Sequence, residues 1–268
     1  MKQLKLMVLT LTLLMGTMFT SCMDSGESGP QQWAGVVKVN DRIMGYVTFT
    51  DAAGTELIPT NTIPVTLNAR MAYIYCQVDE GQDLSTNPKS IKITLLADPT
   101  GIDATAITTP KVGESGDVTT NAPVGSLSFV SGYSTVAPFQ FSENTIVLPV
   151  LYRVKNVTTT EDIKNELAKH TFTLVCYTDD IKSGDTILKL YLRYKVEDEP
   201  AAIAERATRT SSFKAYEISQ ILREYTLKSG QTKPAKITIV AQQNEYNNKL
   251  EDTSTIEKVY EIEYKTAE

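Results

Sequence analysis

One stretch of the chain, DTILKLYLRYKV at residues 185–196, alternates between two kinds of side chain. The residues that share one face of this stretch are apolar or aromatic: Leu188, Leu190, Leu192, Tyr194 and Val196. The residues between them are more polar: Ile187, Lys189, Tyr191, Arg193 and Lys195. Because successive residues of a β-strand point to opposite faces, the stretch predicts a strand with one face in a core. Such a strand is typical of a β-sandwich.

Shorter runs of the same type fill the chain between residues 33 and 98, and no helical pattern separates them. The clearest lie at residues 33–39, 42–50, 70–78 and 90–98, and a further short one ends at Pro59. Asn40 and Asp41 join the first two runs and suit a tight hairpin turn. Short strands in this number predict a small, partly open β-barrel, of which the OB-fold is one option. We assign the barrel to residues 33–105.

Residues 99–121 are rich in Thr, Gly, Asp and Pro, which favours a junction between domains. Strand patterns then resume, so we predict an antiparallel β-sandwich over residues 106–268. The segment TTEDIKNELAKH predicts one short helix, with Thr160 as its N-cap. The segment SSFKAYEISQILREY, residues 211–225, is ambiguous: its apolar residues from Ile218 to Tyr225 repeat at helical spacing better than its first half alternates, but its all-β surroundings favour a strand with an irregular end. The fold class is therefore all-β with one short helix, and a hydrophobic content of 41% provides a packable core.

Residues 1–21 have the features of a secretory signal peptide. Two lysines precede an apolar run at residues 7–19, which is shorter than the ~20 residues that a membrane-spanning helix needs. The run ends in FTSC at residues 19–22, which resembles the lipobox of bacterial lipoproteins, with Phe in place of the usual Leu. The resemblance implies cleavage before Cys22 and lipidation of its sulfur. An ordinary signal peptide followed by a chance cysteine is the alternative.

Residues 22–32 have the composition of a flexible tether after the lipidated cysteine. Stable anchoring takes more than one acyl chain on such a residue. We therefore expect an exported protein that is lipid-anchored to the outer membrane, on its periplasmic or its cell-surface face.

The run GYVTFTDAAGTELIPTN at residues 45–61 follows the predicted anchor and lies within the predicted barrel. Together with the lipobox and the later sandwich pattern, it resembles the NigD-like lipoproteins of Gram-negative bacteria. This resemblance implies an N-terminal OB-type domain, a C-terminal β-sandwich and a secreted protein. The family takes its name from a bacteriocin gene cluster, which implies immunity or antagonism as one function. It transfers no catalytic residues to this chain.

Candidate catalytic and metal-binding residues are few. The single histidine, His170, is expected at the C-terminal end of the short helix, facing the helix dipole. One histidine excludes multi-histidine zinc ligation. Cys76 and Cys176 each lie in an apolar run and are expected to be small buried residues; a disulfide between them is the alternative.

The acidic side chains do not form a recognisable site either. The pairs Asp79-Glu80, Asp179-Asp180 and Asp198-Glu199 each end a predicted strand, which favours solvated turns. The stretch TDDIKSGD at residues 178–185 lacks the spacing of an EF-hand calcium loop. We therefore predict no metal, no cofactor and no enzymatic activity.

Aromatic residues give the remaining candidates for a binding site. Nucleic acid is excluded as a partner, because the net charge is −6 and the chain has no basic block. OB barrels bind ligands on one face with aromatic side chains as platforms, and the barrel aromatics are Trp33, Tyr46, Phe49, Tyr73 and Tyr75. They predict a surface for a protein or a glycan, and core packing is the alternative.

These features together predict a membrane-anchored, extracytoplasmic lipoprotein that acts as a non-enzymatic binding module for a protein or a glycan. A bacteriocin-related immunity or antagonism factor is one alternative. A carboxylate-based hydrolase is another, and it would need two carboxylates facing each other across a cleft.

Overall fold

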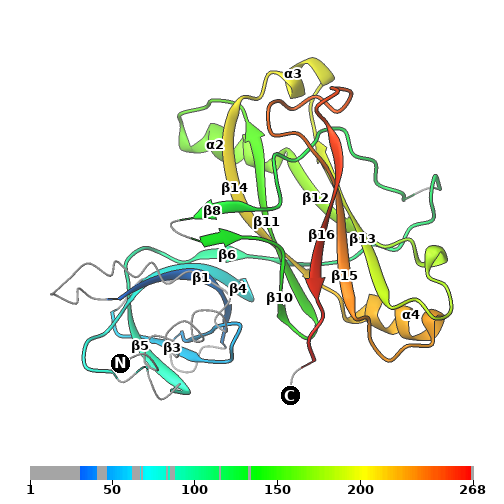
Figure 1. The fold of residues 1–268 in the computed structure, drawn as a ribbon. Coiled ribbons are helices and arrows are strands. Elements are labelled where there is room, and N and C mark those ends of the chain that lie inside the picture. The colour runs from blue at the N-terminus through cyan, green and yellow to red at the C-terminus, as the bar shows by residue number, and fades with distance from the viewer. Residues whose placement is uncertain are drawn as a thin grey trace. The chain divides into compact units, whose positions relative to one another are not determined.

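The structure is a computed structural model (Figure 1), and it describes residues 31–40, 47–61, 67, 69–82, 84, 88–114, 116–131 and 134–266. The chain divides into two compact units. The first consists of Met1–Ala104 with Val130–Val136, and the second of Thr105–Phe129 with Ala137–Glu268. Strands dominate both units, which confirms the all-β fold class.

The first unit is a closed barrel. Its strands are β1 (Gln32–Val39), β2 (Phe49–Thr50), β3 (Glu56–Pro59), β4 (Met71–Val78) and β5 (Ser90–Leu95). They pair in the order β1-β2-β3-β5-β4, and β4 pairs back onto β1 to close the ring. The β3–β5 pair is parallel, whereas β1–β4 is antiparallel. A five-stranded barrel of this kind is the OB-type architecture that the sequence predicts. A sixth strand, β6 (Thr100–Ile102), pairs with β4.

The barrel core follows from strand alternation. On β4 the side chains of Ala72, Ile74 and Cys76 are buried, and β5 contributes Ile91 and its alternate neighbours in the same way. Burying one such aliphatic side chain is worth about 1.5–3 kcal/mol. The short strands of the barrel are therefore held together by one apolar cluster.

The second unit contains two four-stranded sheets. One has the order β10-β11-β14-β7, formed by β7 (Ala104–Ala106), β10 (Phe139–Ser142), β11 (Thr145–Val154) and β14 (Thr208–Glu217). The other has the order β12-β13-β15-β16, formed by β12 (His170–Val175), β13 (Ile187–Val196), β15 (Lys236–Gln243) and β16 (Ile256–Glu263). The strands β8 (Phe129–Ser131) and β9 (Ser134–Val136), which lie almost entirely in the first unit, form a separate two-stranded sheet.

One apolar core joins the two four-stranded sheets as a sandwich. The predicted alternation of β13 is confirmed, because Leu188, Leu190 and Leu192 are buried whereas Lys189 is exposed. Most strand pairs are antiparallel, but β13 pairs with β15 in parallel. A parallel pair needs a crossover connection, and the chain between these strands contains α3 (Pro200–Ala204), β14 and α4 (Ser219–Ser229).

The predicted short helix is present as α2 (Thr160–Ala168) between β11 and β12. Its N-cap is Thr159 and not Thr160, since the Thr159 hydroxyl accepts a hydrogen bond from the Asp162 amide at 3.1 Å. Ile163 and Leu167, the helical pair that predicts this helix, are 42% and 43% exposed. The residue of α2 that is buried is Glu166.

The prediction of a strand over residues 211–225 is wrong for the second half of that segment. Strand β14 ends at Glu217, and α4 begins at Ser219. Ile221 and Tyr225 lie four residues apart and are both buried, so burial along a helical stripe overrides the β surroundings. Gly230 ends the helix in the left-handed conformation, with φ of 74°.

Candidate functional site

The structure separates the aromatic residues that the sequence proposes as a binding surface. Trp33 and Phe49 are buried in the barrel core. Tyr73 is half-buried and Tyr75 is 40% exposed, both on β4. Tyr46 lies outside the described residues. Trp33 and Phe49 are therefore core-packing residues, and among the four described candidates the β4 tyrosines are the ones that present surface to a ligand.

A pocket of about 510 Å³ lies in the second unit, where β13 begins. We call it the β13 pocket. Its wall comes from the short η2 turn (Thr178–Asp180) and the loop that follows, and its floor comes from β13 and β15. The lining residues that bear chemistry are Tyr177, Asp180, Asp185, Lys189, Tyr191 and Thr238. The pocket therefore combines aromatic faces with carboxylates, hydroxyls and one ammonium group.

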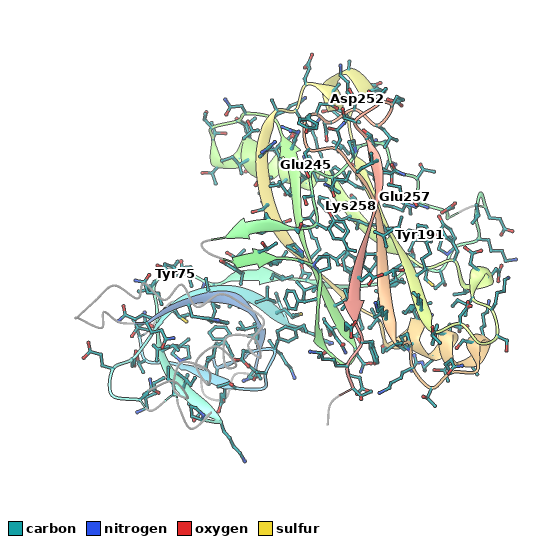
Figure 2. The ribbon with its side chains drawn as sticks, viewed as in Figure 1. Tyr75, Tyr191, Glu245, Asp252, Glu257 and Lys258 are labelled. Carbon is teal, nitrogen blue, oxygen red and sulfur yellow. The ribbon has the colours of Figure 1, made fainter. Side chains whose placement is uncertain are left out.

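Strand alternation positions the aromatic part of this pocket. Lys189, Tyr191 and Arg193 are alternate residues of β13 and share its polar face, where Figure 2 labels Tyr191. The Lys189 ammonium lies 4.9 Å and the Arg193 guanidinium 5.1 Å from the centre of the Tyr191 ring. Cation–π attraction of this type is worth about 0.5–1 kcal/mol at exposed sites. The Tyr191 ring is thus held in place by the cations two residues before and two residues after it on the same strand face.

Tyr177 is fixed by its hydroxyl group. The hydroxyl donates to Asp117 Oδ1 at 2.9 Å and accepts from Arg193 Nη2 at 3.0 Å. Its ring lies 5.2 Å from that of Tyr191, at an angle of 59°. Hydrogen bonds from the Gly113 amide and from Tyr177 lower the pKa of Asp117, which therefore stays ionised as an acceptor. The two tyrosines form a preorganised aromatic corner.

The loop that forms the wall of the pocket is tied to the end of α4. Lys228 Nζ donates to the Thr178 carbonyl at 2.8 Å and to Asp179 Oδ1 at 3.1 Å. The Gly184 amide donates to the Ser229 carbonyl at 2.8 Å. Gly184 has φ of 88°, a backbone conformation that favours glycine. These bonds restrict the loop without occupying the pocket.

The sequence did not reveal this pocket. It identified Lys189, Tyr191 and Arg193 only as the polar face of a strand, and residues 178–185 only as a failed calcium loop. Tyr177 meets Tyr191 because β12 pairs with β13, with Val175 opposite Tyr191. The pattern Lys-x-Tyr-x-Arg on one strand face was the available signal, since it places two cations beside one ring.

His170 lies elsewhere than expected. It is the buried first residue of β12, two residues after α2 ends, and not a residue of the helix end. Its Nδ1 lies 2.7 Å from the Tyr194 hydroxyl and its Nε2 lies 3.3 Å from Glu166 Oε1. Burial lowers the pKa of His170 although Glu166 opposes the shift. The ring is a neutral hydrogen-bonding group in the core.

Glu166 also accepts from a buried arginine. Arg206 Nε lies 2.7 Å from Glu166 Oε1, and Arg206 Nη2 lies 3.0 Å from Asp198 Oδ2. Asp198 is therefore an ion-pair partner and not the simple solvated turn residue that was expected. Burial raises the pKa of Glu166, but hydrogen bonds from the Lys155 amide, Arg206 and His170 outweigh that effect and lower it. We infer that this cluster stabilises the fold.

Both remaining cysteines are free thiols in separate cores. Cys76 lies in the barrel cluster and Cys176 in the sandwich cluster, so the disulfide alternative does not occur. Burial raises the pKa of each thiol to about 12. Within the described ranges, no group of three or more His, Cys, Asp or Glu residues is placed to hold a metal ion. Across the same ranges, no helix is both long enough and apolar enough to span a membrane. Cys22 lies outside the described residues.

No protein-family model matches the chain, and no curated protein is similar to it. Among solved structures, the chain is 96% identical to a Bacteroides fragilis protein described as a lipoprotein. The match covers 89% of this chain and 100% of that one, with a TM-score of 0.81.

Two more distant structures share the fold alone. A Bacteroides vulgatus protein of unknown function is 11% identical, with coverage of 87% and 91% and a TM-score of 0.56. A NigD-like immunity protein from Bacteroides caccae is also 11% identical, with coverage of 87% and 94% and a TM-score of 0.50. The same succession of barrel and sandwich therefore occurs at very low sequence identity.

Proposed function

We propose that this chain is a glycan-binding protein of the cell envelope. It belongs to the lipoprotein family of its 96%-identical Bacteroides fragilis relative, as its resemblance to the NigD-like lipoproteins predicts. In this proposal it is non-enzymatic and stands on the outer membrane through a lipid on Cys22. The structure-based support for the ligand class is the β13 pocket. The support for the anchor is the sequence of residues 1–32.

The size and chemistry of the β13 pocket favour a sugar over a flat protein epitope. Its volume of about 510 Å³ falls within the range of small-molecule sites. A sugar ring has apolar C–H groups that can contact the part of Tyr191 that lines the pocket, and hydroxyl groups that can hydrogen-bond to Asp180, Asp185 and Lys189. The two carboxylates and one ammonium lining the pocket do not select for a strongly charged ligand. A neutral or weakly charged glycan fits this combination.

The binding proposal is tested on a glycan array of bacterial-envelope and host polysaccharides. We expect wild-type protein to bind at least one glycan and Tyr191→Ala to lose that signal. Tyr75→Ala is the control, because Tyr75 is a strand tyrosine with an accessible side chain, as Tyr191 is in part, but lies in the barrel. Loss of binding in Tyr75→Ala and not in Tyr191→Ala would move the site to the barrel. Envelope pull-downs that recover a protein while the array stays empty would favour a protein partner.

The same glycan distinguishes binding from hydrolysis. Asp180 and Asp185 both line the pocket, so the hydrolase alternative places its carboxylates there. We expect the bound glycan to be recovered intact after prolonged incubation. Cleavage products that disappear in Asp185→Asn would contradict a purely binding role.

The anchor is tested by replacing its attachment point. Cys22→Ala should leave the membrane fraction, because no acyl chains then hold the protein to the bilayer. Ser25→Ala, in the same tether, should stay with the membrane. A Cys22→Ala protein that fractionates with the outer membrane would contradict lipidation at this residue.

Immunity against a neighbouring toxin producer is the alternative function that the family resemblance implies. Its support is that resemblance and the name of the Bacteroides caccae structure. Deletion of the gene should sensitise cells to toxin-producing neighbours if this alternative is correct. Unchanged sensitivity together with glycan binding would favour the proposal above.

A further inference from the structure

Two arginines lie side by side on the outer face of the second unit's β10-β11-β14-β7 sheet. Arg153 on β11 is directly opposite Arg209 on β14 in the strand register, so their side chains leave the same face of the sheet. Arg153 is 8% exposed, whereas Arg209 is exposed. We call these two residues the arginine pair.

Backbone carbonyl groups are the acceptors of the arginine pair. Arg153 Nη1 donates to the Ala207 carbonyl at 3.1 Å and Arg153 Nη2 to the Glu245 carbonyl at 2.6 Å. Arg209 Nη2 donates to the same Glu245 carbonyl at 2.8 Å, and Figure 2 labels Glu245. The carboxylate of Glu245 is turned elsewhere, with its Oε1 accepting from the Gln243 amide at 3.0 Å. Two guanidinium groups thus converge on one neutral oxygen.

The charges of the arginine pair are not balanced within the described part of the chain. No carboxylate oxygen there lies within 4.0 Å of either guanidinium group. Arg153 Nε is buried and has no hydrogen-bond partner among the described residues. Arg206, which is also buried, contacts the carboxylates of Glu166 and Asp198. Buried charges are normally paired with an opposite charge, so Arg153 is the exception.

We propose that the arginine pair binds a phosphate or sulfate group. Guanidinium groups recognise oxyanions through paired, parallel N–H donors. Two guanidinium groups with no carboxylate oxygen within 4.0 Å, among the described residues, match a dianion better than a singly charged carboxylate. The exposed Arg209 gives the anion its route of entry, and Arg153 supplies the buried end of the site. The group arrives either as a free ion or on a phosphorylated sugar, and the chemistry at the arginines is the same in both cases.

The first measurement is thermal unfolding of the full mature chain with added anion. Sodium phosphate, sodium sulfate and glucose 6-phosphate are compared with sodium chloride at matched ionic strength, and glucose alone is included. Matching is needed because salt by itself screens the repulsion between the two arginines. At an anion concentration well above Kd, the expected rise in Tm over the chloride sample is about 3 °C or more.

Variants identify the site. Arg209→Gln should reduce the affinity at least tenfold, and it is the variant of choice because an exposed residue can be changed without unfolding the protein. Arg223→Gln is the matched control, since Arg223 is an exposed arginine on α4, at the opposite end of the second unit from α3 in Figure 1. This control should retain the full rise in Tm.

These measurements distinguish a site for a free ion from a site for a phosphorylated sugar. A rise with inorganic phosphate or sulfate that Arg209→Gln abolishes supports a site for the free ion. A rise with glucose 6-phosphate alone, with the same dependence on Arg209 and none with glucose, supports a phosphorylated sugar. No rise above chloride, or a rise of equal size in Arg209→Gln, would overturn the proposal. None of these outcomes depends on glycan binding at Tyr191, so the two proposals fail independently.

Discussion

Replacing Arg206 by methionine should destabilise the sandwich strongly. The Arg206 side chain is 0% exposed and donates two hydrogen bonds to Glu166, at 2.7 and 3.2 Å. Methionine fills a similar volume but leaves the Glu166 carboxylate buried without the guanidinium group that balances its charge. Removing one partner of a buried ion pair costs about 3–5 kcal/mol. For a unit of this size, that loss corresponds to a fall in Tm of about 6–20 °C.

The partner variant and the double variant test the physical reason. Glu166→Met should cost a similar amount, because it leaves Arg206 with only Asp198 as counter-ion. The double variant should be less destabilised than the sum of the two, since replacing both charges with apolar groups is often neutral. Urea unfolding followed by circular dichroism measures all three differences.

A surface ion pair provides the matched control. Lys236 Nζ lies 2.9 Å from Glu261 Oε2, with side chains that are 38% and 58% exposed. Lys236→Met should leave the urea midpoint almost unchanged, because exposed pairs contribute little. If Arg206→Met were as harmless as Lys236→Met, or if the double variant lost the full sum, burial of the Glu166–Arg206 pair would not be the cause of stability.

Three further predictions follow from burial. His170 has a lowered pKa in the folded state, so the free energy of unfolding should fall as the pH drops below the unfolded-state pKa of about 6.5. His170→Gln should make the urea midpoint less dependent on pH between pH 7 and 5.5. The single tryptophan, Trp33, lies in the barrel core, so its fluorescence should report the unfolding of the barrel. We expect Arg206→Met to leave the urea midpoint of this fluorescence transition unchanged; a lower midpoint would show that the two units unfold together. Cys76 and Cys176 are buried thiols with pKa values of about 12, so Ellman's reagent should label neither at pH 8 until denaturant is added.

The sequence predicted the elements whose pattern is local. Strand β13 shows this most clearly, because its alternation alone places Leu188 inside and Lys189 outside. The short strands of the barrel are also visible as alternating runs. Helix α4 was missed although Ile218, Ile221 and Tyr225 repeat at helical spacing, because the β-rich surroundings were given more weight than that spacing.

The candidate sites depend on contacts between distant segments, which a single sequence does not show. Trp33 and Phe49 have the composition of a binding platform, yet the closure of the barrel turns them into its core. Arg153 and Arg209 are 56 residues apart in sequence and meet only through the β11–β14 register. Nothing in the sequence around Glu166 indicates a buried ion pair, because its partner Arg206 is 40 residues away.

The most direct test of the central claim is calorimetric titration of the tightest array glycan into the wild-type protein and two tyrosine variants. The account predicts that Tyr191→Ala raises Kd by about tenfold or more, because an aromatic face is removed from the pocket. It also predicts that Tyr75→Ala leaves Kd unchanged. An unchanged Kd in Tyr191→Ala would contradict glycan binding in the β13 pocket.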